Sequence, residues 1–222
     1  MKIALSILAV VVVLLLLPLL KSPATLDATP PAEQAMPWQI ELLPDGRTKV
    51  FGLIPGSSAL AEARRPFGNT AQLALIAPKD APASLEVYFE MVTLGALTGK
   101  AILTIEVTTT DLETMQGRAA KTDYMATGTK KYLLNAADLA AAEQRAIRAI
   151  AFIPAPNLDE QIILQRFGPP AERIRQGETL EHFLYPAKGL DVVLDSKGKE
   201  VLQYVAPKNF ASLRDPLLKP GS

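Results

Sequence analysis

The chain has no cysteine and a single histidine, His182, among its 222 residues. Without cysteine no disulfide can form, so packing alone must hold the fold in an oxidising compartment. Zinc and haem sites are built mainly from Cys and His, and we therefore predict neither a metal nor a cofactor. A lipid anchor attached through cysteine is excluded on the same ground.

An excess of charge of either sign is also missing. Lys and Arg together number 23, Asp and Glu together number 23, and the formal net charge is +0. Because nucleic-acid binding requires a basic stripe, we predict no nucleic-acid partner. The glycines follow neither GxxxxGK[ST] nor GxGxxG, the patterns that bind phosphates, and the sequence indicates no small-molecule ligand.

Apolar residues are concentrated at the start of the chain, where residues 3–20 read IALSILAVVVVLLLLPLL. A run of ~20 apolar residues matches the ~30 Å hydrocarbon core of a bilayer. We therefore predict a signal-anchor transmembrane helix over residues 1–21, which binds the membrane through residues 3–20. The few positive charges beyond it favour an orientation with the bulk of the chain outside. A cleaved signal peptide ending after Ala24 is the alternative.

Proline and turn signals divide the rest of the chain. The stretch after the apolar run contains four prolines and is typical of an extended spacer, with a tail of no particular role as the alternative. Folded structure is predicted to begin near Trp38. The predicted segments are a spacer over 22–37, a first α+β unit over 38–110, a helical connection over 111–146, a second α+β unit over 147–206 and a C-terminal tail over 207–222.

Two stretches of the chain share one plan. They read LIPGSSALAEARRPFG from Leu53 and FIPAPNLDEQIILQRFG from Phe152, and each ends in Phe-Gly after a short helical segment. Strand-like segments follow both. We therefore predict an α+β fold: the N-terminal transmembrane helix, then two units of one helix and an antiparallel meander. Whether the units share one sheet or pack as separate lobes is open.

Three motifs of the second unit carry a resemblance. They are RFGPP at 166–170, HFLY at 182–185, and LDVVLD at 190–195 followed by Gly198. Over residues 157–205 the chain resembles the SmpA/OmlA (BamE-like) family of small envelope lipoprotein domains. The resemblance implies a helical hairpin on a three-stranded antiparallel sheet, in a periplasm-facing protein that binds partners and does not catalyse. The family's lipoprotein cysteine is absent here, and less than a third of the chain is covered.

Catalytic chemistry has little support in the local sequence. His182 is suited to acid–base work, but the local sequence implies neither a nucleophile nor a carboxylate within hydrogen-bond reach of it, so we predict a partly buried or interface histidine. Two carboxylate pairs fit structural roles better than a glycosidase site. Asp159 and Glu160 suit the first turn of a helix, and Asp191 and Asp195 suit a turn. We predict no catalytic residue and no enzyme.

These features together predict a membrane-anchored, non-catalytic protein-binding or scaffolding module of the bacterial cell envelope. Its expected location is the inner membrane, single-pass, with most of the chain periplasmic, or the soluble periplasm if the first segment is cleaved. An envelope protein is the expected partner. We expect Phe183, Tyr185 and Tyr204 on the partner surface, with core packing as the competing role of each.

Two alternative functions stay open. One is an exported enzyme with a site near His182, completed by Ser58 or Glu181 in the folded chain. The other is a secreted inhibitor-like module, because tandem helix-plus-sheet units, the BamE-like/BLIP-like arrangement expected here, are also used to block enzymes. That second alternative rests on analogy of fold alone.

Overall fold

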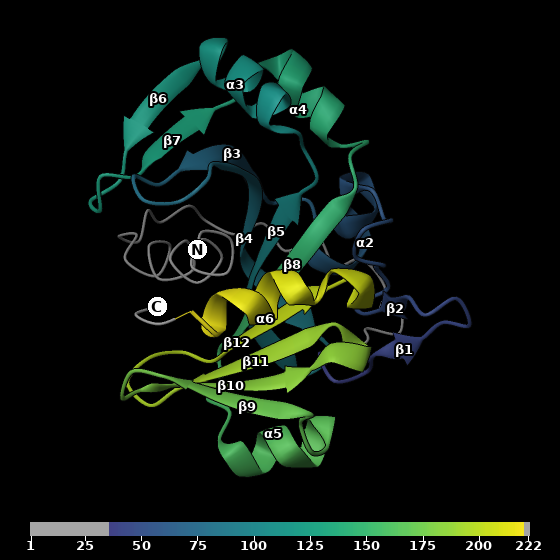
Figure 1. The fold of residues 1–222 in the computed structure, drawn as a ribbon. Coiled ribbons are helices and arrows are strands. Elements are labelled where there is room, and N and C mark those ends of the chain that lie inside the picture. The colour runs from purple at the N-terminus through teal and green to yellow at the C-terminus, as the bar shows by residue number, and fades with distance from the viewer. Residues whose placement is uncertain (1–35, 220–222) are drawn as a thin grey trace.

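The computed structural model describes residues 36–219, and its largest feature is one antiparallel sheet of ten strands (Figure 1). The strands are β3 (Gln72–Ala77), β4 (Ser84–Leu94), β5 (Leu97–Ile105), β6 (Lys121–Tyr124), β7 (Lys130–Leu133), β8 (Ile147–Pro154), β9 (Glu172–Gln176), β10 (Leu180–Tyr185), β11 (Leu190–Asp195) and β12 (Val201–Val205). Their order across the sheet is β6-β7-β3-β4-β5-β8-β12-β11-β10-β9. A separate two-stranded ribbon consists of β1 (Glu41–Leu42) and β2 (Thr48–Lys49).

The helices are short. They are η1 (Leu60–Ala63), α2 (Arg64–Phe67), α3 (Thr109–Gly117), α4 (Ala136–Ala142), α5 (Glu160–Phe167), η2 (Pro186–Lys188), η3 (Pro207–Asn209) and α6 (Ala211–Leu217). Side-chain caps fix the start of three of them: Thr108 accepts from the Asp111 backbone N–H, Asn135 from that of Asp138, and Asp159 from that of Ile162. Such caps satisfy backbone donors that a helix leaves free at its first turn.

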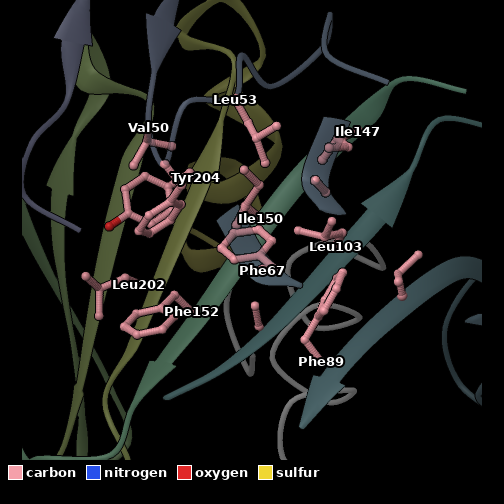
Figure 2. Close-up of a cluster of buried hydrophobic side chains, with 14 of the residues drawn as sticks. Val50, Leu53, Phe67, Phe89, Leu103, Ile147, Ile150, Phe152, Leu202 and Tyr204 are labelled. Carbon is pink, nitrogen blue, oxygen red and sulfur yellow. The ribbon is translucent and has the colours of Figure 1, made fainter. Parts of the chain in front are cut away.

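The main hydrophobic core lies on one face of the sheet, which we call the core face. Successive strand residues point to opposite faces, and Leu103, Ile150 and Tyr204 point into this core from β5, β8 and β12 (Figure 2). The buried side chains of η1, α2, α3 and α5 pack against the same core. Only α6, among the helices of residues 36–219, contributes hydrophobic side chains to a cluster on the other face, which we call the opposite face.

An aromatic group ties the N-terminal ribbon to this core. Phe51, just after β2, places its ring 5.5 Å from Phe67, 5.8 Å from Phe152 and 5.4 Å from Tyr204, measured between ring centroids. Its φ of 55° is unfavourable for a bulky residue. Each aromatic pair contributes about 0.5–1.5 kcal/mol beyond its buried area, which offsets that backbone cost.

The fold class that we predicted is wrong. In place of two helix-plus-meander units, the described residues form one mostly antiparallel ten-stranded sheet with few helices. Of the two arrangements left open, the strands share one sheet, which the pairing of β8 with β12 joins. The physical reason lies in β8, IRAIAFIP, which is buried on both faces along nearly its whole length. A strand that is apolar on both sides belongs in the centre of a sheet, between two neighbours.

The predicted transmembrane helix over residues 3–20 lies outside the described residues, as does nearly all of the spacer predicted over 22–37. Within residues 36–219, no helix is long and apolar enough to cross a membrane, and the longest, α3, has 9 residues. A bilayer span needs ~20. The described residues therefore contain nothing that corresponds to the signal-anchor helix on which the predicted single-pass location in the inner membrane depended.

The segment 111–146, expected to be a helical connection, contains a hairpin as well as helices. It holds most of α3, then β6 and β7, then α4. β7 pairs with β3 and so extends the sheet at one end. Asp138, buried in α4, is held by the guanidinium of Arg118 and by the side chain of Asn135. Since a buried carboxylate must be paired, these contacts fix α4 against the end of α3.

Leu103→Ala tests the position of the core. Leu103 is fully buried in β5, so the substitution leaves a cavity, and we expect the free energy of unfolding to fall by about 2–5 kcal/mol. Urea denaturation followed by circular dichroism measures it. Leu42→Ala is the matched control, because Leu42 is 61% exposed and its loss should change stability by less than about 0.5 kcal/mol. Equal losses in the two variants would contradict the described core.

Candidate functional site

A polar cluster interrupts the opposite face of the sheet. His182, Asp191 and Gln203 come together there from the neighbouring strands β10, β11 and β12. His182 Nδ1 lies 2.8 Å from Asp191 Oδ2, and Gln203 Nε2 donates to the same oxygen at 3.3 Å. Their exposed fractions are only 1%, 1% and 4%. These three residues are called the polar cluster below.

The polar cluster has unused hydrogen-bonding capacity. Three of its buried atoms have no hydrogen-bond partner: His182 Nε2, Asp191 Oδ1 and Gln203 Oε1. Buried polar atoms in native proteins are nearly always paired, and each unpaired one costs about 1–3 kcal/mol. A cost of this kind, repeated three times in one cluster, makes these residues the candidate functional site.

The protonation of the cluster decides which groups it can bind. Burial raises the pKa of Asp191, and the hydrogen bond and charge of His182 act against that rise. The contact between Nδ1 and Oδ2 requires one proton between them. When that proton is on Nδ1 of a neutral ring, Nε2 carries a lone pair and accepts. Asp191 Oδ1 and Gln203 Oε1 are then acceptors too, so all three unpaired atoms would pair with hydrogen-bond donors.

An apolar strip adjoins the polar cluster on the same face. It consists of eight buried side chains: Ala74, Ile76, Tyr88, Ile102, Ala151, Ile153, Val193 and Val201. Direct cross-strand pairs align one row through both features, in the order Tyr88, Ile102, Ala151, Gln203, Asp191. The row therefore changes from apolar to polar as it passes from β4 to β11.

The two sides of the polar cluster are covered differently. On one side α6 packs Phe210 and Leu213 against Leu184 and Val205. On the other side lies the apolar strip, to which no helix within residues 36–219 contributes a hydrophobic side chain. The hydrophobic residues packed against the strip are Met125, Leu133 and Leu180, which belong to strands or a turn. No helix within residues 36–219 thus places a hydrophobic side chain on the strip, although all eight of its members are buried.

A second buried carboxylate lies on the same face. Glu86 in β4 is 6% exposed, accepts from the Ser84 hydroxyl at 2.6 Å and has no partner for its other oxygen. Burial raises its pKa to about 7, and the Ser84 hydrogen bond opposes the rise. Glu86 precedes Tyr88 by two residues and so shares its face. The opposite face therefore carries titratable groups at both ends of the strip.

The residues expected on a partner surface are in the core instead. Phe183, Tyr185 and Tyr204 are all buried, at 0%, 5% and 1% exposed. Both hydroxyls are used internally: that of Tyr204 donates to the Pro37 carbonyl at 2.8 Å, and that of Tyr185 to the Gly168 carbonyl at 2.9 Å. The three therefore form no exposed surface, and a partner surface made of them is ruled out for the structure described.

The residues suggested as helpers of His182 have other partners. Ser58 accepts from the Ile54 backbone N–H and donates to Glu62. Glu181 accepts from Arg173 at 2.9 Å. Neither forms a hydrogen bond with His182, whose ring instead contacts a residue that the sequence assigned to a turn.

Of the two carboxylate pairs considered in the sequence, one member of each has the structural role that we predicted. Asp159 caps α5, and Asp195 accepts from the Lys197 backbone N–H in the turn before β12. Asp191 departs from expectation, because it pairs with His182 inside the sheet. Within residues 36–219 no group of three or more His, Asp or Glu side chains is arranged to hold a metal ion.

Comparisons with known proteins give no further guide. No family model matches the chain, and neither a curated protein nor a solved structure matches it. The resemblance of residues 157–205 to the SmpA/OmlA family therefore stays a prediction.

Glu86→Gln tests the environment of this face through pH. The pKa of Glu86 rises from 4.5 to about 7 on folding, so the folded state holds a proton that the unfolded state has released. The stabilisation of the folded state by protonated Glu86 is fully present below pH 4.5 and is lost as pH rises through about 7. From pH 5 to pH 8 the wild type should lose roughly 2–3 kcal/mol more than the Gln variant.

Urea denaturation at each pH measures this difference. Burial also raises the pKa of Asp191. Its effect on stability is the same in the wild type and in the Gln variant, so it cancels from the difference between them. Glu113→Gln, at an exposed position of α3, is the control and should keep the wild-type slope. A wild-type stability that is flat or rises over this interval would contradict the burial of Glu86.

Proposed function

We propose that this protein is a non-catalytic binding module, and that its partner or ligand occupies the opposite face of the sheet. One observation carries the proposal: an apolar strip and a partly unpaired polar cluster lie side by side on that face. An apolar sheet face needs a second layer. Unpaired buried polar atoms add a second reason for an occupant, since each gains a hydrogen bond when the site is filled.

Other surfaces offer weaker binding sites. The exposed large hydrophobic side chains are scattered over the sheet, the ribbon and the helices; they are Leu42, Met91, Tyr124, Leu139 and Leu218. Both edge strands are short and charged, with Lys121 and Asp123 on β6 and Arg173 and Arg175 on β9. Short charged edges discourage the addition of a strand. The opposite face is therefore the favoured site.

The alternative of an enzyme near His182 has one observation in its favour. The contact between His182 and Asp191 orients the ring as a general base requires. A base must also reach a nucleophile or a proton to abstract, and His182 Nε2 has no hydrogen-bond partner. We therefore favour binding over catalysis for this site, in agreement with what the resemblance to the SmpA/OmlA family implies.

The inhibitor-like alternative loses its basis. It rested on analogy with tandem helix-plus-sheet units. The continuous ten-stranded sheet has no such units, so this function is not proposed.

Photo-crosslinking tests the proposal. The full chain is expressed in its host with p-benzoylphenylalanine in place of Tyr88, a residue of the apolar strip that is 7% exposed. After irradiation we expect a new covalent adduct, because the benzophenone lies within the occupied site. Intact-mass spectrometry detects it and shows whether the adduct is small or protein-sized.

Tyr124 is the matched control for this experiment. It is also a tyrosine on the sheet, but it lies in the edge strand β6 and is 71% exposed. The same substitution there should give no adduct or unrelated ones. If position 88 yields no mass increase, or yields the same adducts as position 124, the opposite face is not the binding site and the proposal fails.

A further inference from the structure

We propose that the apolar run of this same chain at residues 3–20, called the N-terminal segment below, packs on the apolar strip and is a built-in occupant of the opposite face. This inference rests on the proposed binding function, because it names an intramolecular competitor that a partner must displace. It follows from the burial of the strip, from the few described side chains that cover it, and from the length and chemistry of the segment.

The strip is buried although few hydrophobic side chains of the described chain lie over it. Its eight members are at most 7% exposed. Among residues 36–219, the hydrophobic side chains packed against them are Met125, Leu133 and Leu180. Leu133 lies on β7 beside β3, Met125 follows β6, and Leu180 lies on β10 beside β11, so all three flank the ends of the strip. Its middle, on β4, β5, β8 and β12, has no such cover within the described range, and an apolar sheet face needs a second layer.

The strip and the N-terminal segment have similar lengths. The members of the strip lie on six neighbouring strands, in the order β3-β4-β5-β8-β12-β11. At about 4.8 Å per strand spacing, the distance from β3 to β11 is ~24 Å. Residues 3–20, which the sequence predicts to be helical, would be ~27 Å long as a helix at about 1.5 Å per residue. One helix therefore extends over the whole strip.

The connection from the N-terminal segment to the described chain is long enough for this contact. Residues 21–35 can span up to about 50 Å, at ~3.3 Å per residue. The chain that follows them is fixed at β12, where the Pro37 carbonyl accepts from the Tyr204 hydroxyl. β12 is itself a strand of the strip, and the farthest strand, β3, is only ~19 Å from it across the sheet. The connection can therefore pass round the sheet and reach every part of the strip.

The composition of the N-terminal segment suits the strip and the polar cluster beside it. Residues 3–20 contain no charged side chain and one hydroxyl, that of Ser6, and a helix that is apolar all round requires burial. Lys2 precedes the segment and Lys21 follows it. Whichever end lies beside the polar cluster thus brings an ammonium group, which donates to an unpaired acceptor such as Asp191 Oδ1.

Thiol crosslinking in the full chain tests the contact. The chain has no cysteine, so only introduced thiols react. Val12→Cys lies at the middle of the N-terminal segment and Ile102→Cys lies on β5 within the strip, so the pair reports the contact in either orientation of the segment. With bismaleimidoethane we expect a crosslink between positions 12 and 102, identified by peptide mass mapping.

Val12→Cys combined with Glu113→Cys is the matched control. Glu113 is exposed on α3, and α3 packs its buried Met115 against the core face. A segment that moves freely on its connection would reach this exposed position at least as often as the buried position 102. We expect the yield of the 12–102 crosslink to be at least about tenfold higher than that of the 12–113 crosslink. Equal yields, or a higher yield at 113, would overturn the inference.

Charges placed in the N-terminal segment should uncover the strip. Val12→Asp with Leu16→Asp introduces two carboxylates, and burying unpaired charges is costly. In the full chain carrying Ile102→Cys, we expect this pair to raise the rate of maleimide labelling at position 102 by at least about tenfold. Leu103→Cys is the control, because Leu103 is the next residue of β5 and faces the core, so its labelling rate should not change. An unchanged rate at 102, or an equal rise at 103, overturns the inference.

The outcomes separate this inference from the proposed function. If a partner competes with the N-terminal segment, the variant with Val12→Asp and Leu16→Asp gives more adduct at position 88 than the wild type, and both proposals are supported. If positions 12 and 102 crosslink but neither protein forms an adduct at 88, the segment is the sole occupant and the proposed function fails alone. If adducts form at 88 and positions 12 and 102 do not crosslink, this inference fails alone.

Discussion

The pairing of β8 with β12 is the contact on which the rest of the structure depends. It joins the strands that precede α5 to those that follow it, and it aligns Ile150 with Tyr204 and Ala151 with Gln203. This register sends the first pair into the core and the second pair to the opposite face. A slip of one residue would exchange the two faces, and both the core and the polar cluster would be lost.

Local features of the fold were predictable from the sequence, and the joining of the sheet was not. Phe67-Gly68 and Phe167-Gly168 end α2 and α5, each with the glycine at a positive φ that glycine tolerates. Asn135 caps α4, a position at which asparagine is preferred. Chain-local signals of this kind carry no information on which distant strands pair. Whether the two sets of strands share one sheet was therefore left open, although the two-sided apolar pattern of β8 is typical of a central strand.

The site was predictable only in part for a similar reason. His182 stood out as the one histidine, but Asp191 was assigned to a turn because its neighbours in sequence suggested one. The two residues meet diagonally across the β10–β11 hairpin on one face of the sheet, because His182 lies opposite Val193 and Asp191 lies opposite Leu184. A register for that hairpin would have brought them together. Gln203 gave no signal at all, since its partner strand and face follow only from the assembled sheet.

The position of β12 has a consequence for how the chain is made. β12 lies in the middle of the sheet, yet only η3 and α6 follow it among the helices and strands of the described chain. The Tyr204 hydroxyl also holds the Pro37 carbonyl, 167 residues away. During synthesis one edge of β8 therefore stays unpaired until β12 has left the ribosome. Contacts so distant in sequence slow folding, and an unpaired strand edge exposes the nascent chain to aggregation.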